Sequence, residues 1–244
     1  MSDGCLVSRL RRYMALTPTE CAVLADMERE EEQKEAGKIV IRRGDSSENV
    51  HVLKSGWAVS RSVGPEGRLQ ILRIFLPGDI VGLAEVGPPE SPHEVVMQTS
   101  GVLCSFPRAG LSRLFIETPR LAALFFALGS LDQVALRDRV ASLGLHSAED
   151  RIIHFLLDLR ARLAITNAQL EDSFRLPFSQ AEIGQIVSLT PVYVNRLLRR
   201  MAREGRVEID KPFIRLLDRS GMERQIGFTD RYYTADTSWF PPPA

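Results

Sequence analysis

The sequence predicts an α+β protein built, in chain order, from a β-roll, a long helix and a winged helix-turn-helix. Three observations support this fold class. Short strand-forming runs fill the segment from Gly37 to Phe106, a glycine-poor apolar stretch follows, and two capped helices with a hairpin lie between Ser179 and Leu217. We therefore expect four segments: an N-terminal arm and roll (1–117), a dimerisation helix with a hinge (118–145), the winged helix-turn-helix (146–220) and an aromatic, proline-rich tail (221–244).

The predicted roll consists of many short strands separated by turns. Its strand-forming runs end at breaks such as Gly44-Asp45, Gly64-Pro65 and Pro77-Gly78, and strands at this spacing are typical of a barrel or roll. The acidic segment from Glu28 to Glu35 precedes the roll, and we interpret it as a solvated helix face or loop. The strand-forming runs cover residues 38–41, 50–53, 57–60, 69–76 and 95–106.

The segment from Pro119 to Leu143 predicts one helix of about 25 residues. Its apolar residues recur at alternating spacings of three and four, which is the heptad-like pattern of a helix that packs against a second copy. An ordinary helix buried within one subunit is the alternative. Gly144 interrupts the pattern and is the predicted hinge, after which Ser147 caps a further helix. The predicted dimerisation seam consists of Leu121, Leu124, Leu128, Leu131 and Ala135.

The segment after Phe178 has the local signals of a winged helix-turn-helix. Ser179 and Glu182 form a capping-box pattern that predicts a first helix over 180–187. Thr190 caps a second helix, and Pro191 occupies its first position, where a fixed φ is favourable. The strand-forming runs 206–209 and 213–217 then predict a hairpin wing. Four residues of the second helix form one apolar stripe that we expect to pack on the first helix: Val194, Leu197, Leu198 and Met201.

The opposite face of this second helix suits base edges in the major groove of double-stranded DNA. Arg bonds guanine bidentately and Asn does so with adenine. Residues 174–219 carry nine Lys and Arg against five Asp and Glu, a net charge of +4 in a chain that is neutral overall. We expect a homodimer that places two recognition helices (190–203) on a palindromic site. A solvated basic face, on a dimeric scaffold that binds protein, is the alternative. The predicted base-reading residues are Val192, Asn195, Arg196 and Arg199.

Composition limits the remaining classes of function. No apolar run approaches the roughly 20 residues of a membrane span, and the N-terminus lacks a leader pattern, so we expect a cytoplasmic protein without membrane contact. Three widely spaced cysteines favour reduced thiols over a disulfide framework. A metal-dependent small-barrel enzyme is a competing class, because a roll with His51 and His93 could cradle a metal. No compact ligand set, phosphate loop or nucleophile elbow supports it, and we expect no catalytic residues.

Three motifs resemble the Crp/Fnr family of bacterial transcription regulators, in an order that covers about residues 16–228. They are LPGDIVG at 76–82, QAEIGQIV at 180–187 and LTPVYVNR at 189–196, the last similar to a variant found in alphaproteobacterial members. The resemblance implies a roll like that of cyclic-nucleotide-binding domains (a double-stranded β-helix), a dimerisation helix, and a reader that contacts promoters and RNA polymerase. It also implies that Arg196 reads a guanine, that Asn195 and Val192 lie at base edges, and that phosphates are contacted by Ser179, Gln180, Thr190 and Tyr193.

Departures from the family pattern are equally informative. Val192 stands where a glutamate is common, which predicts half-sites different from the usual ones. Leu83, His93 and Glu94 stand where relatives that bind cyclic nucleotides have the glutamate, arginine and serine that hold the ribose and phosphate, so we expect no cyclic AMP response. Leu136 and Arg137 also depart where such relatives meet the base.

The sequence predicts no other cofactor. Only Cys5 and Cys21 are available for an N-terminal iron–sulfur cluster, which needs several closely spaced cysteines. No two of the four histidines (His51, His93, His146 and His154) have a paired metal-ligand spacing, so we expect no haem or metal site.

Overall fold

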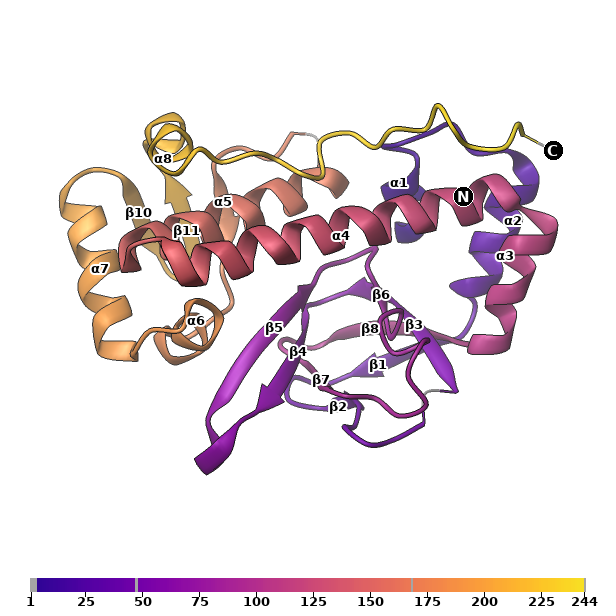
Figure 1. Cartoon of the computed structure of the whole chain (residues 1–244), viewed down its shortest axis with the longest axis horizontal. Coiled ribbons are helices and arrows are strands. Elements are labelled where there is room, and N and C mark those ends of the chain that lie inside the picture. Colours follow the sequence, from indigo (N-terminus) through magenta and orange to yellow (C-terminus); the bar gives the residue numbers. More distant parts are fainter. Residues whose placement is uncertain (1–3, 47, 168, 244) are drawn as a thin grey trace. The chain divides into compact units, whose positions relative to one another are not determined.

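The computed structural model describes residues 4–46, 48–167 and 169–243 (Figure 1). The predicted ends of the arm and tail, residues 1–3 and 244, lie outside this range. The chain forms two compact units, Met1–Ser130 with Thr234–Ala244, and Leu131–Tyr233. The division falls within the long helix α4 (Pro119–Leu145), so each half of this helix belongs to a different unit.

The first unit contains the predicted β-roll, made of two four-stranded antiparallel sheets. Their strand orders are β1-β8-β3-β6 and β2-β7-β4-β5. The side chains between the sheets include Leu53, Met97 and Leu103, all buried. The strands are β1 (Glu31–Lys34), β2 (Ile39–Ile41), β3 (Asn49–Ser55), β4 (Ala58–Val63), β5 (Leu69–Phe75), β6 (Ile80–Val81), β7 (Glu94–Met97) and β8 (Gly101–Pro107), with short 3-10 turns η1 (Pro65–Gly67) and η2 (Arg108–Gly110).

Three strand assignments differ from the sequence-based expectations, and the simplest is that the short strand β6 lies outside the predicted runs. The segment expected as a solvated helix face or loop contains strand β1, which pairs with β8 from Glu31↔Cys104 to Lys34↔Gly101. An edge strand needs only its backbone for pairing, so charged side chains remain in solvent and leave no hydrophobic signal. The run 95–106 forms two strands, β7 and β8, separated by residues 98–100, and Gly101 at the start of β8 packs so closely on the Ser55 carbonyl that a Cβ would collide there.

Helices cover the outer face of the first of these sheets. They are α1 (Cys5–Leu10), α2 (Pro18–Met27), α3 (Leu111–Glu117) and the start of α4. Alternate strand residues such as Val52 and Cys104 join their apolar side chains in one cluster. Two buried ion pairs lock the layer: Arg9 Nη2 lies 2.7 Å from Asp79 Oδ1, and Arg120 Nη2 lies 2.7 Å from Glu20 Oε2.

The predicted dimerisation seam requires correction at its N-terminal end. Leu121 and Leu124 are fully buried in the cluster beneath α1 and α2, and Leu128 packs against it. This stripe therefore faces the core of its own unit. Exposed apolar side chains lie elsewhere on α4, namely Phe126, Leu136, Val140 and Leu145, which are 71%, 47%, 62% and 84% exposed. Phe126 and Leu136 are ten residues apart, which is one heptad plus three, and Val140 follows four residues later. This spacing puts Phe126, Leu136 and Val140 on one side of the helix.

Helix α4 bears on the expectation about membrane spans. Among the described helices it alone has the length and apolar composition to cross a membrane, with a mean hydropathy of 1.2 over its most apolar window. The apolar face of its first turns, which carries Leu121 and Leu124, is buried in the core of the first unit. Asp132, Asp138 and Arg139 follow in its second half.

The second unit contains the predicted winged helix-turn-helix. The helices α6 and α7 begin and end where the capping signals predict, and two further elements, β9 and α8, were not predicted. The sheet order is β10-β11-β9. The elements are α5 (Ala148–Thr166), β9 (Ser173–Arg175), α6 (Gln180–Val187), α7 (Pro191–Arg203), β10 (Val207–Asp210), β11 (Phe213–Leu216) and α8 (Arg219–Ile226).

The end of α4 supports the reader within this unit. Arg139 Nη2 donates to the Ile186 carbonyl in α6 at 2.8 Å, and burial lowers the pKa of Arg139. Gly144 lies inside the last turn of α4, and the helix ends one residue later, before Ser147 caps α5. The break therefore falls at His146-Ser147, next to the predicted hinge.

The C-terminal tail has no helix or strand between the end of α8 and residue 243, the last one described, yet it packs in both units. In the second unit Arg231 Nε lies 2.6 Å from Asp138 Oδ2, and the buried Tyr232 donates its hydroxyl to Asp132 at 3.3 Å. In the first unit Trp239 packs edge-on against Phe126, with ring centroids 6.2 Å apart. The tail residues Tyr232 and Trp239 therefore pack along α4.

Candidate nucleic-acid interface

The helix-turn-helix is held by a tight turn between α6 and α7. Ser188 ends α6 in the left-handed conformation (φ 56°, ψ 49°), and the Leu189 N–H donates to the Gly184 carbonyl at 3.0 Å. Gly184 approaches the Leu189 carbonyl so closely that a Cβ would collide with it. Only glycine fits there, so this residue fixes how the two helices cross.

Helix α7 divides cleanly into a buried and an exposed face. Its stripe of Val194, Leu197, Leu198 and Met201 is buried as predicted. On the other side Val192 is 80% exposed, and Arg196 and Arg199 are exposed beside it. Three of the four predicted base-reading side chains therefore project from one free helical face.

Asn195, the fourth predicted base reader, is half-buried and turns toward α6. Its Oδ1 accepts a hydrogen bond of 3.0 Å from Gln180 Nε2. Gln180, predicted to contact phosphate, is thus engaged with the recognition helix instead. The contact joins residues 15 positions apart, and neither spacing nor composition signals it.

The other predicted phosphate contacts lie at helix starts or on α7. Ser179 Oγ and Thr190 Oγ1 accept the capping bonds from Glu182 N and Tyr193 N at 3.2 and 3.3 Å, and both residues are exposed. The Tyr193 ring lies 4.4 Å from the guanidinium carbon of Arg196, a cation–π contact that restricts the arginine to the outer face.

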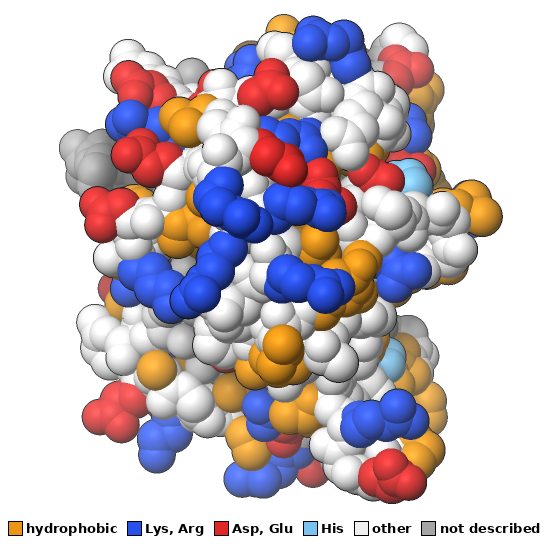
Figure 2. Space-filling view, turned by 90° about the vertical axis from the view of Figure 1, so that its left-hand side faces the viewer, with side chains coloured by type: hydrophobic (Ala, Val, Ile, Leu, Met, Phe, Trp, Pro, Cys, Tyr) orange, Lys and Arg blue, Asp and Glu red, His pale blue; other side chains and the backbone are white. Residues whose placement is uncertain are grey.

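Basic side chains gather over this part of the molecule. Figure 2 views the α7 side and shows a group of Lys and Arg side chains across the face. Arg200 and Arg206 are partly neutralised there, because both form ion pairs with Glu149 of α5. The exposed basic residues of α7 and the wing sheet, including the paired Arg200, are Arg175, Arg196, Arg199, Arg200, Arg203, Lys211 and Arg215.

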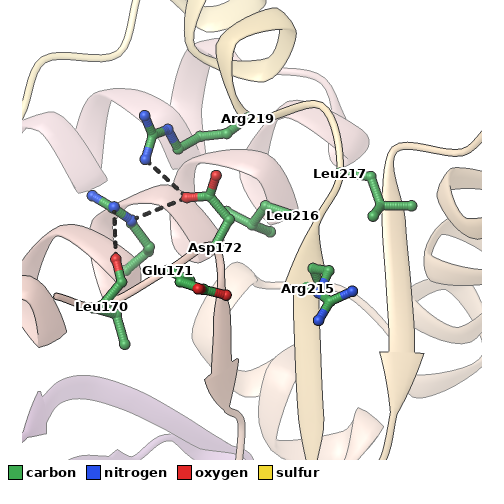
Figure 3. A pocket seen from close by; sticks show the side chains of 8 residues that line it. Leu170, Glu171, Asp172, Arg215, Leu216, Leu217 and Arg219 are labelled. Atoms are coloured by element: carbon green, nitrogen blue, oxygen red, sulfur yellow. Dashed lines mark hydrogen bonds and ion pairs between the residues drawn. The ribbon is translucent and has the colours of Figure 1, made fainter.

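A cavity of about 500 Å³ lies elsewhere in the second unit, near the base of the wing (Figure 3). Its charges are largely paired with one another. Arg219 Nη1 and Arg160 Nε lie 2.8 and 3.4 Å from Asp172 Oδ1, and Arg160 Nη2 donates to the Leu170 carbonyl. None of the sequence-predicted site residues lines it.

Acidic side chains lie at or near the positions of the roll that the family resemblance assigns to the phosphate of a cyclic nucleotide. Glu94 follows His93, which stands at the position of the family's phosphate-binding arginine, and Arg61 is paired with this carboxylate, with Nε and Nη2 at 2.8 and 2.6 Å from Glu94 Oε1. Glu85, on the loop after Gly82, is another buried acid, and burial raises its pKa. Two acidic side chains would oppose an anionic phosphate.

The thiols and imidazoles have structural surroundings. Cys5 Sγ donates to Glu28 Oε1 at 2.9 Å, and burial together with that carboxylate raises the pKa of Cys5. His51 Nδ1 lies 2.8 Å from Ser105 Oγ, and burial lowers the pKa of His51. Within residues 4–46, 48–167 and 169–243, no three His, Cys, Asp or Glu side chains form a group able to hold a metal ion.

Comparison with known proteins covers both units. A family model described as Crp-like helix-turn-helix domain matches residues 150–225, and one described as cyclic nucleotide-binding domain matches residues 31–118. The transcriptional regulatory protein btr of Bordetella pertussis is 30% identical over 228 residues, covering 92% of this chain and 93% of its own. The fumarate and nitrate reduction regulatory protein of Escherichia coli is 24% identical, covering 93% and 90%.

A solved structure shares the fold. FixK2 from Bradyrhizobium japonicum superimposes with a TM-score of 0.71 at 23% identity, covering 80% of this chain and 95% of its own. The relatives are transcription regulators, and the reader, roll and long helix occur here in the same chain. On this evidence the chain belongs to the Crp/Fnr family and is a DNA-binding transcription regulator.

Proposed function

We propose that this regulator acts in the cytoplasm as a homodimer that reads a palindromic promoter site without cyclic AMP, and that its reader also contacts RNA polymerase. The observation that carries the proposal is the free basic face of α7, whose buried stripe fixes its orientation on α6. A two-fold dimer would present two such helices about 34 Å apart, the repeat of the major groove.

The proposed dimer contact lies on the exposed face of α4, with Leu136 and Val140 at its centre. Apolar side chains this exposed lose contact with water when a second helix covers them, which favours association. Leu131 and Ala135 take no part in this contact. Around the helix Ala135 lies midway between Asp132 and Asp138, the two residues that bond the tail, and so faces away from Leu136 and Val140.

In the proposed complex Arg196 and Arg199 bond base edges, and the side chain of Val192 makes apolar contact with a thymine methyl. Ser179, Thr190 and Tyr193 contact phosphates in this complex. They lie at the N-terminal ends of α6 and α7, and helix N-termini favour anions. The wing residues Lys211 and Arg215 add phosphate contacts on the flank.

Selection of bound sequences from a random double-stranded library, with purified protein and no added ligand, tests the proposal. We expect a two-fold symmetric site to be enriched, and Arg196→Glu to abolish the enrichment. Arg68→Glu is the matched control, because Arg68 is an exposed arginine in the roll and its reversal changes the net charge equally. Enrichment of the same site by Arg196→Glu would show that this face does not read the bases, whereas no enrichment by the wild-type protein would favour a scaffold that binds protein.

The proposed independence from cyclic AMP is tested by calorimetry. Calorimetric titration of the full chain with cyclic AMP should give no saturable heat, because Glu94 would repel an anionic phosphate and the neighbouring Arg61 is already paired with Glu94. Saturable micromolar binding would contradict it.

A further inference from the structure

A direct side-chain hydrogen bond between Gln180 and Asn195 joins α6 to the reading face of α7. Gln180 Nε2 donates to Asn195 Oδ1 at 3.0 Å, and both side chains are half-buried. An asparagine amide has one acceptor oxygen and one donor NH₂ group. With Oδ1 turned toward α6, the NH₂ group is the part of Asn195 that points away from α6, and a base edge on that side would meet the donor first.

The base edges differ in whether they can use such a donor. Bidentate pairing of asparagine with adenine needs the oxygen to accept from N6 and the NH₂ group to donate to N7. Guanine offers two acceptors, N7 and O6, whereas cytosine offers only a donor at N4. The orientation of the amide therefore decides which base Asn195 can bond.

We propose that Gln180 is a positioning residue that sets the base specificity of Asn195 by holding its amide with the donor group outward. Asn195 then favours guanine and rejects cytosine, and it gives up the bidentate pairing with adenine. This inference rests on the proposed function, since it concerns the same recognition helix.

Gln180→Glu tests the inference because it reverses the polarity of the contact. A carboxylate only accepts, so Asn195 must turn its NH₂ group toward α6 and its oxygen toward the DNA. The preference at the base that Asn195 reads should then shift roughly tenfold from guanine toward cytosine or adenine, the bases with an amino donor. Gln180→Ala should instead relax the preference, since either amide orientation becomes available.

The experiment compares full-length variants on the selected palindrome with all four bases substituted symmetrically at each position. Asn195→Ala identifies the position that Asn195 reads, and Gln180→Glu in that background should cause no shift in base preference. Gln185→Glu is the matched control, being the same change on the same helix. Thermal unfolding of each variant verifies that the fold is retained.

Three outcomes would overturn the inference. In the first, Gln180→Glu and Gln180→Ala weaken binding equally for all four bases, as loss of a phosphate contact would. In the second, Asn195→Ala alters no base preference. In the third, the wild-type protein selects no site, which overturns the proposed function as well; the first two outcomes leave that function intact.

Discussion

At the scale of single residues, the surroundings of the cysteines decide their chemistry. Cys104 is buried in the sheet, and burial together with the charge of Glu28 raises its pKa to about 11. The thiolate is the reactive form, and about one molecule in a thousand carries it at pH 8. Cys5 is similarly held by Glu28, whereas Cys21 is half-exposed on α2.

We therefore expect alkylation of the native protein at pH 8 to modify Cys21 first and Cys104 last, with peptide mass spectrometry over time as the measurement. Unfolding in denaturant should make the three rates similar. Alkylation of Cys104 as fast as Cys21 in the native state would contradict this explanation and restore a redox role for the buried thiol.

The contribution of Glu20 to folding stability should depend on pH. Burial disfavours its charged form, but hydrogen bonds from Arg120 and Thr17 outweigh burial and lower the pKa of Glu20. A pKa that is lower in the folded state gives stability above the unfolded value, near 4.3, that is lost as the pH falls through the folded value. Glu20→Gln should thus destabilise the first unit by about 2 kcal/mol at pH 7, and the difference should shrink below about pH 4.

Urea unfolding at pH 7 and at pH 3.5 measures this difference. Glu117→Gln is the control, because Glu117 makes an exposed ion pair with Arg113 and its loss should have a smaller effect. An effect of Glu20→Gln that is equal at both pH values would indicate lost packing rather than lost charge.

At the scale of elements, alanine substitutions at two glycines in helices should have opposite effects on stability. Gly184→Ala would bring a methyl group onto the Leu189 carbonyl, so the turn must shift. We expect a loss of at least about 2 kcal/mol and of specific DNA binding. A Cβ on Gly144 meets nothing within 4 Å, and alanine should stabilise that helical turn by about 0.5–1 kcal/mol. Thermal unfolding and DNA titration measure both, and lost DNA affinity in stable Gly144→Ala would support the predicted hinge.

The elements also show what could be predicted from the sequence. Helices α6 and α7 were predictable because Ser179, Glu182, Thr190 and Pro191 are local signals that act within one turn. Strand β1 was not, because the backbone of an edge strand pairs whatever its side chains are. The seam was assigned to the wrong face of α4 at Leu121 and Leu124, since a heptad stripe looks the same whether a second copy or the unit's own core covers it.

At the scale of the whole molecule, charge is concentrated where DNA is proposed to bind. The chain is neutral overall, but the reader exposes basic residues on α7 and on the wing. Each phosphate that a basic side chain neutralises releases counterions, so the logarithm of affinity falls with that of salt concentration by about 0.9 per contact. We expect a slope of magnitude at least about 4 for the dimer, and Lys211→Ala, present twice per dimer, to reduce it by about 2. Fluorescence anisotropy between 50 and 200 mM salt gives the slope, and a flat dependence would contradict phosphate contact.

The assembly itself depends on one face of α4. Leu136 and Val140 expose apolar surface one turn apart, so aspartates at both positions would place charges in the middle of a helix-to-helix contact. We expect Leu136→Asp with Val140→Asp to sediment as a monomer whose helical content is unchanged. Because one reader contacts only a half-site, its affinity for the palindrome should fall by at least about a hundredfold, while affinity for a half-site changes little. Val63→Asp is the control, being a similar change at an exposed valine of the roll. A double variant that remains dimeric would exclude this face, and the contact would then have to be sought at another exposed apolar site such as Phe115 and Ile116 of α3.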